Sequence, residues 1–183
     1  MIPFPDLKTE RLLLRELTAG DAESLFRYFS DDRVTDYYDL ETFTETSQAL
    51  ALIETWQAGW RQDICLRFGI ALSHDPSNII GTCGFHGWRR EHSRTQIGYE
   101  LNPAYWGKGI MAEALAAVIE FGFEQMGWNR IEALIHSAND RSRQLLEKSG
   151  FREEGYLREY YWEKGKFIDA VIFSMLSNEY KSR

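Results

Sequence analysis

The chain has 183 residues, of which 44% are hydrophobic, and its formal net charge is −7. This length and apolar content favour a single domain over 1–183, with a core at about 8–178, and they exclude disorder as a description of the whole. The acidic balance argues against a nucleic-acid partner, which needs clustered Lys and Arg. No apolar run approaches the ~20 residues that cross a bilayer, so we expect no membrane partner.

The cysteines and histidines carry little chemistry in this sequence. Cys65 and Cys83 are too few for a disulfide scaffold and have no CxxC spacing. The four histidines form no HExxH motif and no His/Cys cluster, so we expect no metal site. Residues 1–6 lack the basic start and apolar stretch of a signal peptide, and we therefore expect a cytoplasmic protein.

The first half of the chain passes from a strand to helices and then to a sheet. Alternation over 10–17 predicts the first strand. Apolar residues at three- and four-residue spacing predict helices at about 21–29 and 44–60. The period then changes and predicts three strands, at 65–72, 79–88 and 95–101, with a polar turn at 74–78 between the first two.

The second half alternates helices and strands before a terminal hairpin. A glycine-containing turn at 106–109 opens a long apolar helix to about residue 126. The remaining predicted elements are a strand at 131–136, a helix at 139–149 ended by Gly150, and two hairpin strands at 151–162 and 167–176. This order predicts a mixed α/β (α+β) fold with helices on the faces of one sheet.

The turn Trp106-Gly107-Lys108-Gly109 is the first chemical signal. Backbone N–H groups at a helix start have no internal partner, and glycine lets a phosphate approach them closely. The Walker pattern is absent, and the dinucleotide pattern GxGxxG would end on Ala112, in a unit that lacks the repeated βαβ order. An ordinary strand-to-helix connection explains these residues equally well.

Four segments together resemble the GNAT superfamily of acyl-CoA-dependent N-acetyltransferases, and most closely its Rim-type branch, named for ribosomal-protein N-terminal acetylation. These segments occur in the family's order, and they are 7–15, 79–85, 97–114 and 139–151. The coenzyme pattern departs from the superfamily's usual one, because Trp106 and Met111 stand where Gln or Arg, and Gly or Ala, are common. A Trp at the first position is common in the Rim-type branch.

The resemblance implies a fold and a co-substrate. The fold would be a mostly antiparallel sheet of six to seven strands, flanked by about four helices, with two central strands splayed around the coenzyme. The co-substrate would be acetyl-CoA, without a metal. A backbone N–H of Leu101 or Asn102 would polarise the thioester carbonyl, and the amides from Gly107 to Met111 would bind the pyrophosphate. The implied coenzyme-binding residues are Leu101, Trp106, Gly107, Lys108, Gly109, Ile110, Met111, Asn139 and Ser142.

The resemblance also suggests catalytic residues, each with a plainer alternative. Glu100 is the candidate base, although a solvent-facing strand residue would look the same. Ser142 is the candidate that protonates the leaving thiolate, against a plain helix-surface serine. Asn139 fits both a helix N-cap and a pantetheine contact. Three hairpin tyrosines are rivals for the acid role or candidates for the acceptor pocket: Tyr156, Tyr160 and Tyr161.

The implied activity is direct acetyl transfer to an amine in a ternary complex, without a covalent enzyme intermediate. The acceptor would be a protein N-terminal amine or a small-molecule amine, and a homodimer is left open. Two rival functions also stay open at this point, a non-catalytic acyl-CoA-binding sensor and an aminoglycoside-type drug acetyltransferase.

Overall fold

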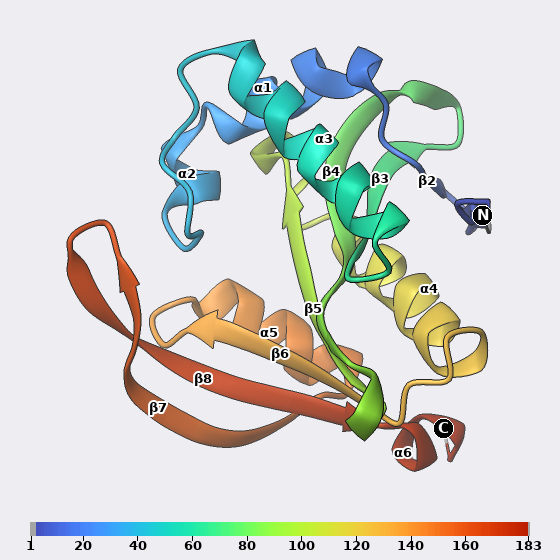
Figure 1. Cartoon of the computed structure of the whole chain (residues 1–183), viewed down its shortest axis with the longest axis vertical. Coiled ribbons are helices and arrows are strands. Elements are labelled where there is room, and N and C mark those ends of the chain that lie inside the picture. The colour runs from blue at the N-terminus through green and yellow to red at the C-terminus, as the bar shows by residue number, and fades with distance from the viewer. Residues whose placement is uncertain (1–2, 183) are drawn as a thin grey trace.

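The computed structural model describes residues 3–182 and arranges them as an open sheet with helices on both faces (Figure 1). Its strands are β1 (Leu7–Lys8), β2 (Leu12–Arg15), β3 (Leu66–Leu72), β4 (Asp75–Arg89), β5 (Arg94–Leu101), β6 (Arg130–His136), β7 (Arg152–Glu163) and β8 (Lys166–Leu176). Its α-helices are α1 (Ala22–Phe29), α2 (Asp32–Thr35), α3 (Thr46–Arg61), α4 (Ile110–Glu124), α5 (Asp140–Ser149) and α6 (Ser177–Lys181). No helix within residues 3–182 is long and apolar enough to span a membrane.

The strand order is β1-β2-β3-β4-β5-β6-β8-β7, and every neighbouring pair is antiparallel except β5 and β6. The predicted mixed α/β class with a mostly antiparallel sheet is therefore confirmed. The resemblance implied six to seven strands and about four helices, whereas the described residues form eight strands and six α-helices. The additional elements include β1, α2 and α6, which have two, four and five residues and are too short to show a hydrophobic period. The predicted turn at 74–78 is shorter, since Asp75 already pairs with Leu72.

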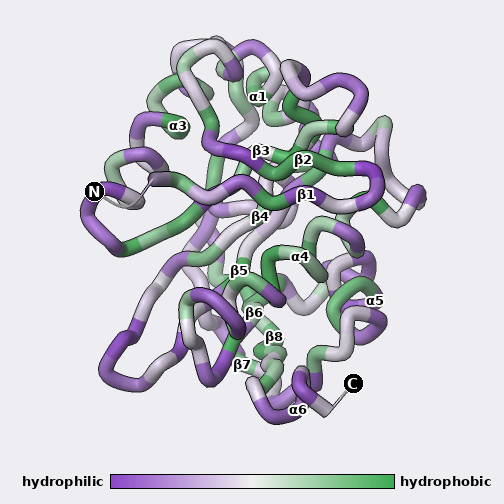
Figure 2. Tube along the Cα trace, turned by 90° about the vertical axis from the view of Figure 1, so that its right-hand side faces the viewer, coloured by the Kyte–Doolittle hydropathy of each residue, from purple (hydrophilic) through white to green (hydrophobic). Residues whose placement is uncertain are grey.

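The core fills both faces of the sheet. In β3, alternate residues Leu66, Phe68 and Ile70 join the apolar cluster that includes α4, whereas Ala71 joins the cluster of α1 and α3. Figure 2 shows the hydrophobic colouring along the strands in the middle of the molecule and the hydrophilic colouring in the outer loops. A strand covered on both faces has no solvent-facing side, so the run is buried almost without interruption.

The parallel pair β5–β6 is short, and this opens the sheet in its middle. Only three pairs join the two strands, Arg94 with Arg130, Thr95 with Ile131 and Gln96 with Glu132. Beyond them β5 continues along β4 to Leu101, while β6 continues along β8 to His136. The two strands therefore diverge toward their carboxyl ends, as the GNAT resemblance predicted.

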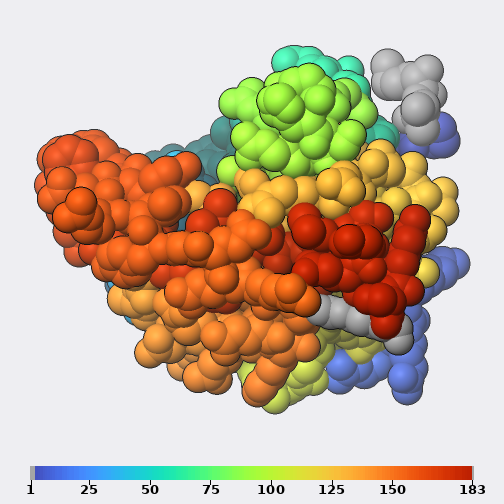
Figure 3. Space-filling view, turned by 90° about the horizontal axis from the view of Figure 1, so that it is seen from below, coloured from blue at the N-terminus to red at the C-terminus, as the bar shows by residue number. Residues whose placement is uncertain are grey.

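The β7–β8 hairpin extends past the rest of the sheet. Figure 3 shows it along the lower face, with its tip projecting at the left. Its register shifts between Leu157 and Tyr161, where Glu159 has a φ of 50°. An irregularity of this kind bends a strand. At the tip, Lys164 Nζ donates to the Thr35 carbonyl at 2.6 Å, which ties the hairpin to α2.

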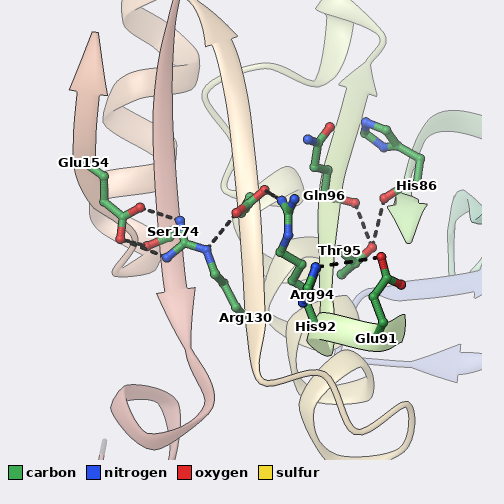
Figure 4. A network of polar contacts seen from close by, with 10 residues as sticks. His86, Glu91, His92, Arg94, Thr95, Gln96, Arg130, Glu154 and Ser174 are labelled. Carbon is green, nitrogen blue, oxygen red and sulfur yellow. Dashed lines mark hydrogen bonds and ion pairs between the residues drawn. The ribbon is translucent and has the colours of Figure 1, made fainter. Parts of the chain in front are cut away.

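A chain of ion pairs crosses β5, β6, β8 and β7 at the closed end of the opening (Figure 4). Arg130 donates to Glu154, which also accepts from Ser174 Oγ at 2.6 Å, and to Glu132 at 2.8 Å. Arg94 donates to the second oxygen of Glu132 at 2.8 Å. The network links β5, β6, β8 and β7 at the end of the sheet where β5 and β6 are still paired, before the two strands diverge.

We predict that the contribution of Glu154 to the free energy of unfolding is lost as the pH is lowered into the acidic range. The hydrogen bonds from Arg130 lower the pKa of Glu154 from 4.5 to about 2, against the opposing effect of burial. A carboxyl whose pKa is lowered by folding stabilises the native state above its unfolded pKa, and this contribution is lost as the pH falls through the folded pKa. In urea unfolding between pH 5 and pH 2, Glu154→Gln should therefore show a flatter pH dependence than the parent. Glu147→Gln, on the exposed surface of α5, is the matched control, and equal slopes for all three proteins would contradict the assignment.

Candidate active site

A cavity of about 520 Å³ lies where β5 and β6 diverge. One wall is formed by Ile97–Tyr99 of β5, Ala133–His136 of β6 and the start of α5. The other wall comes from the segment after α2, from α3 and from the end of β7. Segments distant in sequence therefore surround one space, and this position suits a two-substrate site better than a closed core void.

The backbone of β5 presents hydrogen-bonding groups to this opening. The N–H of Asn102 donates to the Ile80 carbonyl at 2.8 Å. Glu100 lies two residues earlier, opposite Thr82, so its backbone groups point toward β4 as those of Asn102 do. In an antiparallel ladder the intervening residues direct their N–H and C=O groups to the opposite side. The polar groups of Tyr99 and Leu101 therefore face β6, which has moved away. Of the two predicted carbonyl-polarising amides, Asn102 already donates within the sheet.

The predicted glycine turn lies between β5 and α4 and has the conformation that its residues allow. Gly107 and Gly109 have φ of 74° and 72°, in the left-handed region that favours glycine. Gly109 is the N-cap of α4 and is exposed. An added Cβ on Gly107 would meet nothing within 4 Å, so the turn is open on that side. The start of α4 can therefore receive an anionic group.

Side chains around the turn fix it and add positive charge. Trp106 Nε1 donates to the Leu101 carbonyl at 2.8 Å, and the Arg141 guanidinium lies 4.4 Å from the Trp106 ring centroid. Arg11 donates to the Lys108 carbonyl at 3.0 Å and to Glu113 at 2.6 Å. Arg11, Lys108 and Arg141 thus bring positive charge to the turn before α4, where the helix dipole is already positive, and Glu113 offsets part of it.

The start of α5 joins the cavity wall to β5. Asn139 is the N-cap of α5, since its side chain accepts from Ser142 N at 3.1 Å. Ser142 is buried, and its Oγ lies 2.6 Å from Tyr99 Oη. Burial raises the pKa of Tyr99 well above its usual range, although the contact with Ser142 opposes this. Both Asn139 and Ser142 line the cavity, together with Tyr99, which the sequence did not single out.

Glu100 lies behind the cavity wall and is 7% exposed. Its carboxylate accepts from Arg67 Nη2 and from Thr82 Oγ1, while Arg67 Nε donates to Thr82 at 2.8 Å. Arg67 also stacks over Trp56 at 5.1 Å. Burial raises the pKa of Glu100, and the Arg67 charge and the Thr82 hydroxyl oppose that rise. The three side chains link β3, β4 and β5 on one face of the sheet.

Of the three tyrosines predicted as rival acids, Tyr161 lines the cavity. Burial raises its pKa to about 12. Tyr156 is exposed and donates to Asp169 at 2.5 Å, and Tyr160 is half exposed on the hairpin surface. Of these three tyrosines, only Tyr161 therefore lies where it could contact a substrate in the cavity.

The sequence analysis gave no weight to two residues that meet in the cavity. His136 Nε2 and Glu163 Oε2 are 2.7 Å apart, and both side chains are mostly buried. His136 ends β6 and Glu163 ends β7, so 27 positions separate them in the chain. No spacing rule could have paired them. Among residues 3–182 no group of three or more His, Cys, Asp or Glu could hold a metal ion.

We predict that Arg67 and Glu100 are energetically coupled, so that removing one partner costs more stability than replacing both. Arg67→Met should destabilise the protein by ~3–5 kcal/mol in urea unfolding, because the carboxylate of Glu100 stays buried without its cation. Replacing both residues, by Arg67→Met with Glu100→Leu, should recover much of that loss. A double variant that loses the sum of the two single losses would show that the side chains act independently.

Comparison with known proteins agrees with this geometry. Residues 11–152 match the family model described as "Acetyltransferase (GNAT) domain". An uncharacterized N-acetyltransferase of Bacillus subtilis, YoaA, is 40% identical over 94% of this chain and 97% of its own. The [ribosomal protein uS5]-alanine N-acetyltransferase of Escherichia coli is 28% identical over 98% of this chain and 94% of its own.

A solved structure shows the same architecture. The GNAT-family acetyltransferase of Bacillus anthracis superposes with a TM-score of 0.85 and 28% identity, over 96% of this chain and 100% of its own. The family model spans most of the chain, and the YoaA relative aligns over nearly its whole length. The chain therefore belongs to the GNAT family of N-acetyltransferases.

Proposed function

We propose that the protein transfers the acetyl group of acetyl-CoA directly to an amine, with both substrates bound at once. The observation that carries this proposal is the cavity between the diverging strands β5 and β6, with the glycine turn next to it. A strand-like pantetheine arm can pair with the β5 backbone groups that face the opening, as an added strand would. The remaining cavity is open to a second substrate from the side of β7 and α2.

The anionic end of the coenzyme fits the start of α4. The proposed contacts are the backbone amides from Gly107 to Met111, with the side chains of Arg11, Lys108 and Arg141 nearby. A helix N-terminus offers unpaired N–H groups and a positive dipole to a pyrophosphate. Trp106 would not donate its indole N–H to the coenzyme, because this group already donates to the Leu101 carbonyl. Its proposed role is to hold the turn in place.

The thioester carbonyl needs a donor where negative charge develops. Leu101 is the better of the two predicted residues for this role, because the N–H of Asn102 already donates to Ile80. The Trp106 indole donates to the Leu101 carbonyl, in the peptide that follows this N–H, and so restrains the backbone of Leu101 on its carboxyl side. An amide held rigidly by its neighbours costs little reorganisation when the oxygen becomes charged.

Direct transfer is supported by the state of the cavity's cysteine. Cys65 lines the cavity, and burial raises its pKa. A thiol with a raised pKa is held in its protonated form, and the thiolate is the nucleophilic form of cysteine. Cys65 is therefore a poor candidate for an acyl-enzyme nucleophile, which agrees with direct attack by the amine on the thioester.

For the acceptor we propose a protein N-terminal amine, and for the location the cytoplasm. The Escherichia coli relative is named for acetylating an alanine of ribosomal protein uS5. In this chain, Asp39 and Glu163 line the cavity on the side away from α4. Carboxylates there would attract the ammonium form in which an amine arrives.

Two catalytic roles stay predictions. Ser142 and its partner Tyr99 are placed to return a proton to the departing thiolate, since their hydroxyls are linked at the cavity wall. Glu100 would have to act on the amine through the Thr82 hydroxyl or through water, because Arg67 and Thr82 contact both of its carboxylate oxygens and a guanidinium does not relay protons. Asn139 caps α5 and so holds the start of the helix that carries Ser142.

The proposal is tested with the purified protein, acetyl-CoA and a panel of amines. The panel should hold a lysine-free peptide beginning with alanine, spermidine, free amino acids and kanamycin. We expect release of free thiol and one acetyl group on the peptide, measured by a thiol reagent and mass spectrometry. Binding of acetyl-CoA by calorimetry without turnover of any amine would favour the sensor, and selective turnover of kanamycin would favour the drug acetyltransferase.

The glycine turn gives a prediction on coenzyme binding. Gly109→Ala should weaken acetyl-CoA binding in calorimetry, because a side chain at φ of 72° strains the loop that presents its amides. Gly127→Ala is the matched control, since Gly127 has a φ of 71° after α4, far along the chain from the turn. Equal affinity for both variants would remove the pyrophosphate assignment.

The hydroxyl pair gives a prediction on turnover. Ser142→Ala and Tyr99→Phe should each lower kcat by ~10²-fold, the lower end for general acids, because a thiolate with a reference pKa of ~8.5 leaves readily. Affinity for acetyl-CoA should change little. Tyr160→Phe, on the exposed hairpin surface, serves as the control. Full activity in both active-site variants would transfer the role to Tyr161 or to water.

A further inference from the structure

The contact between His136 and Glu163 has the form of a base and its orienting group. Their atoms Nε2 and Oε2 are 2.7 Å apart, and the side chains are 11% and 9% exposed. An ionised carboxylate only accepts hydrogen bonds, so Nε2 is the donor in this pair, and in the neutral tautomer that this contact selects Nδ1 has a lone pair. Both residues line the cavity, on its acceptor side.

Neighbouring groups hold the imidazole in one orientation. The Tyr37 ring contacts it edge-on at 5.7 Å, and the Tyr161 ring stacks with it at 6.4 Å, centroid to centroid. The bond from Lys164 to the Thr35 carbonyl holds the hairpin beside Glu163. A ring fixed by two aromatic neighbours and a carboxylate is preorganised, as a group that moves protons must be.

The charged and titratable groups around this pair come from every neighbouring element. Glu163 and Tyr161 approach from β7, Tyr37 and Asp39 from the segment after α2, and Arg67 from the far wall of the cavity. The β8 neighbour of His136 is Ala170, which carries no charge. On the α5 side Asn139 is neutral. The near groups are therefore mainly carboxylates and phenols, which would attract a cationic ammonium group to this part of the cavity.

The other candidate bases are less suited to an amine in the cavity. His86 also lines the cavity, but desolvation of its ring and the charge of Arg67 lower its pKa to about 4. Glu100 is held by Arg67 and Thr82 behind the wall. His136 thus combines access to the cavity with a carboxylate partner.

We propose that His136 is the catalytic base that removes a proton from the acceptor ammonium, with Glu163 as its positioning residue; this inference rests on the proposed acetyl transfer. One proton passes from the ammonium to Nδ1 of His136 and later to solvent. The neutral amine then forms the C–N bond as the C–S bond breaks. The second proton lost by nitrogen neutralises the departing thiolate, so one proton is released for each amide formed.

The pair also indicates which amines are preferred. An imidazole has a reference pKa of ~6.5, an α-amino group ~7.7–8.0 and a lysine amine ~10.4. Proton transfer to an imidazole is therefore far less uphill from an N-terminal amine than from a lysine or a polyamine. We expect faster acetylation of a peptide's N-terminus than of a lysine side chain at neutral pH.

The test uses full-length protein, acetyl-CoA and a lysine-free peptide beginning with alanine. His136→Ala should lower kcat by ~10²–10⁴-fold and flatten the acidic limb of the pH–rate profile, because the base is gone. Added imidazole should restore part of the rate with saturation. Glu163→Gln should lower the rate less, with partial recovery in Glu163→Asp. His74→Ala, at an exposed histidine between β3 and β4 that does not line the cavity, is the matched control and should behave as the parent, without rescue.

Calorimetry with acetyl-CoA checks that each variant keeps its coenzyme site, and His136→Gln replaces His136→Ala if the latter fails to fold. The proposal is overturned if the His136 variants keep the parent rate and pH profile. It is also overturned if they lose rate with an unchanged profile and no rescue by imidazole, which would assign His136 to packing. Should the parent turn over none of the amines, the proposed function fails and this inference fails with it.

Discussion

The site depends on the divergence of two parallel strands after three residue pairs. Each strand is fixed along its other edge, β5 by β4 and β6 by β8, so the opening cannot close without breaking an antiparallel ladder. A chain of ion pairs, from Arg94 through Glu132 and Arg130 to Glu154, links the strands at the closed end of this opening. Beyond that point the backbone groups of β5 face a space instead of a partner strand. Unpaired backbone groups away from water are costly, and a strand-like ligand supplies what the sheet lacks.

Rigidity of the β5 wall comes from a buried ionic cluster. Arg67, Thr82 and Glu100 join three adjacent strands behind the cavity. Gly98 makes room for this arrangement, since an added Cβ would lie 3.0 Å from Arg67 Nη1. A buried ion pair is weak evidence for stability, because desolvation offsets the attraction. Its clearer consequence here is geometric, since it fixes the strand that presents Tyr99 and Leu101.

The charges of the site are sorted along the opening. Cationic side chains, Arg11 and Arg141 among them, surround the start of α4, whereas Asp39 and Glu163 lie on the side of the hairpin. In the proposed function, an anionic coenzyme would be drawn to the start of α4 and a cationic amine to the cavity. The net charge of −7 describes only the sum of these regions and hides their separation. The hairpin that carries Glu163 is tied to α2 through Lys164.

The sequence by itself determined the parts that depend on neighbouring residues. Left-handed backbone at Gly107 and Gly109 follows from the missing Cβ, and the cap of α5 follows from the short side chain of Asn139. The tertiary structure alone decided which side chains meet. Glu100 finds Arg67 across 33 positions, and Tyr99 finds Ser142 across 43, because the sheet order brings their strands and helices together. His136 and Glu163 illustrate the same limit, since each ends a strand and neither has a local pattern. Local sterics act over a few residues, whereas the partners of a buried polar group are chosen by packing over the whole chain.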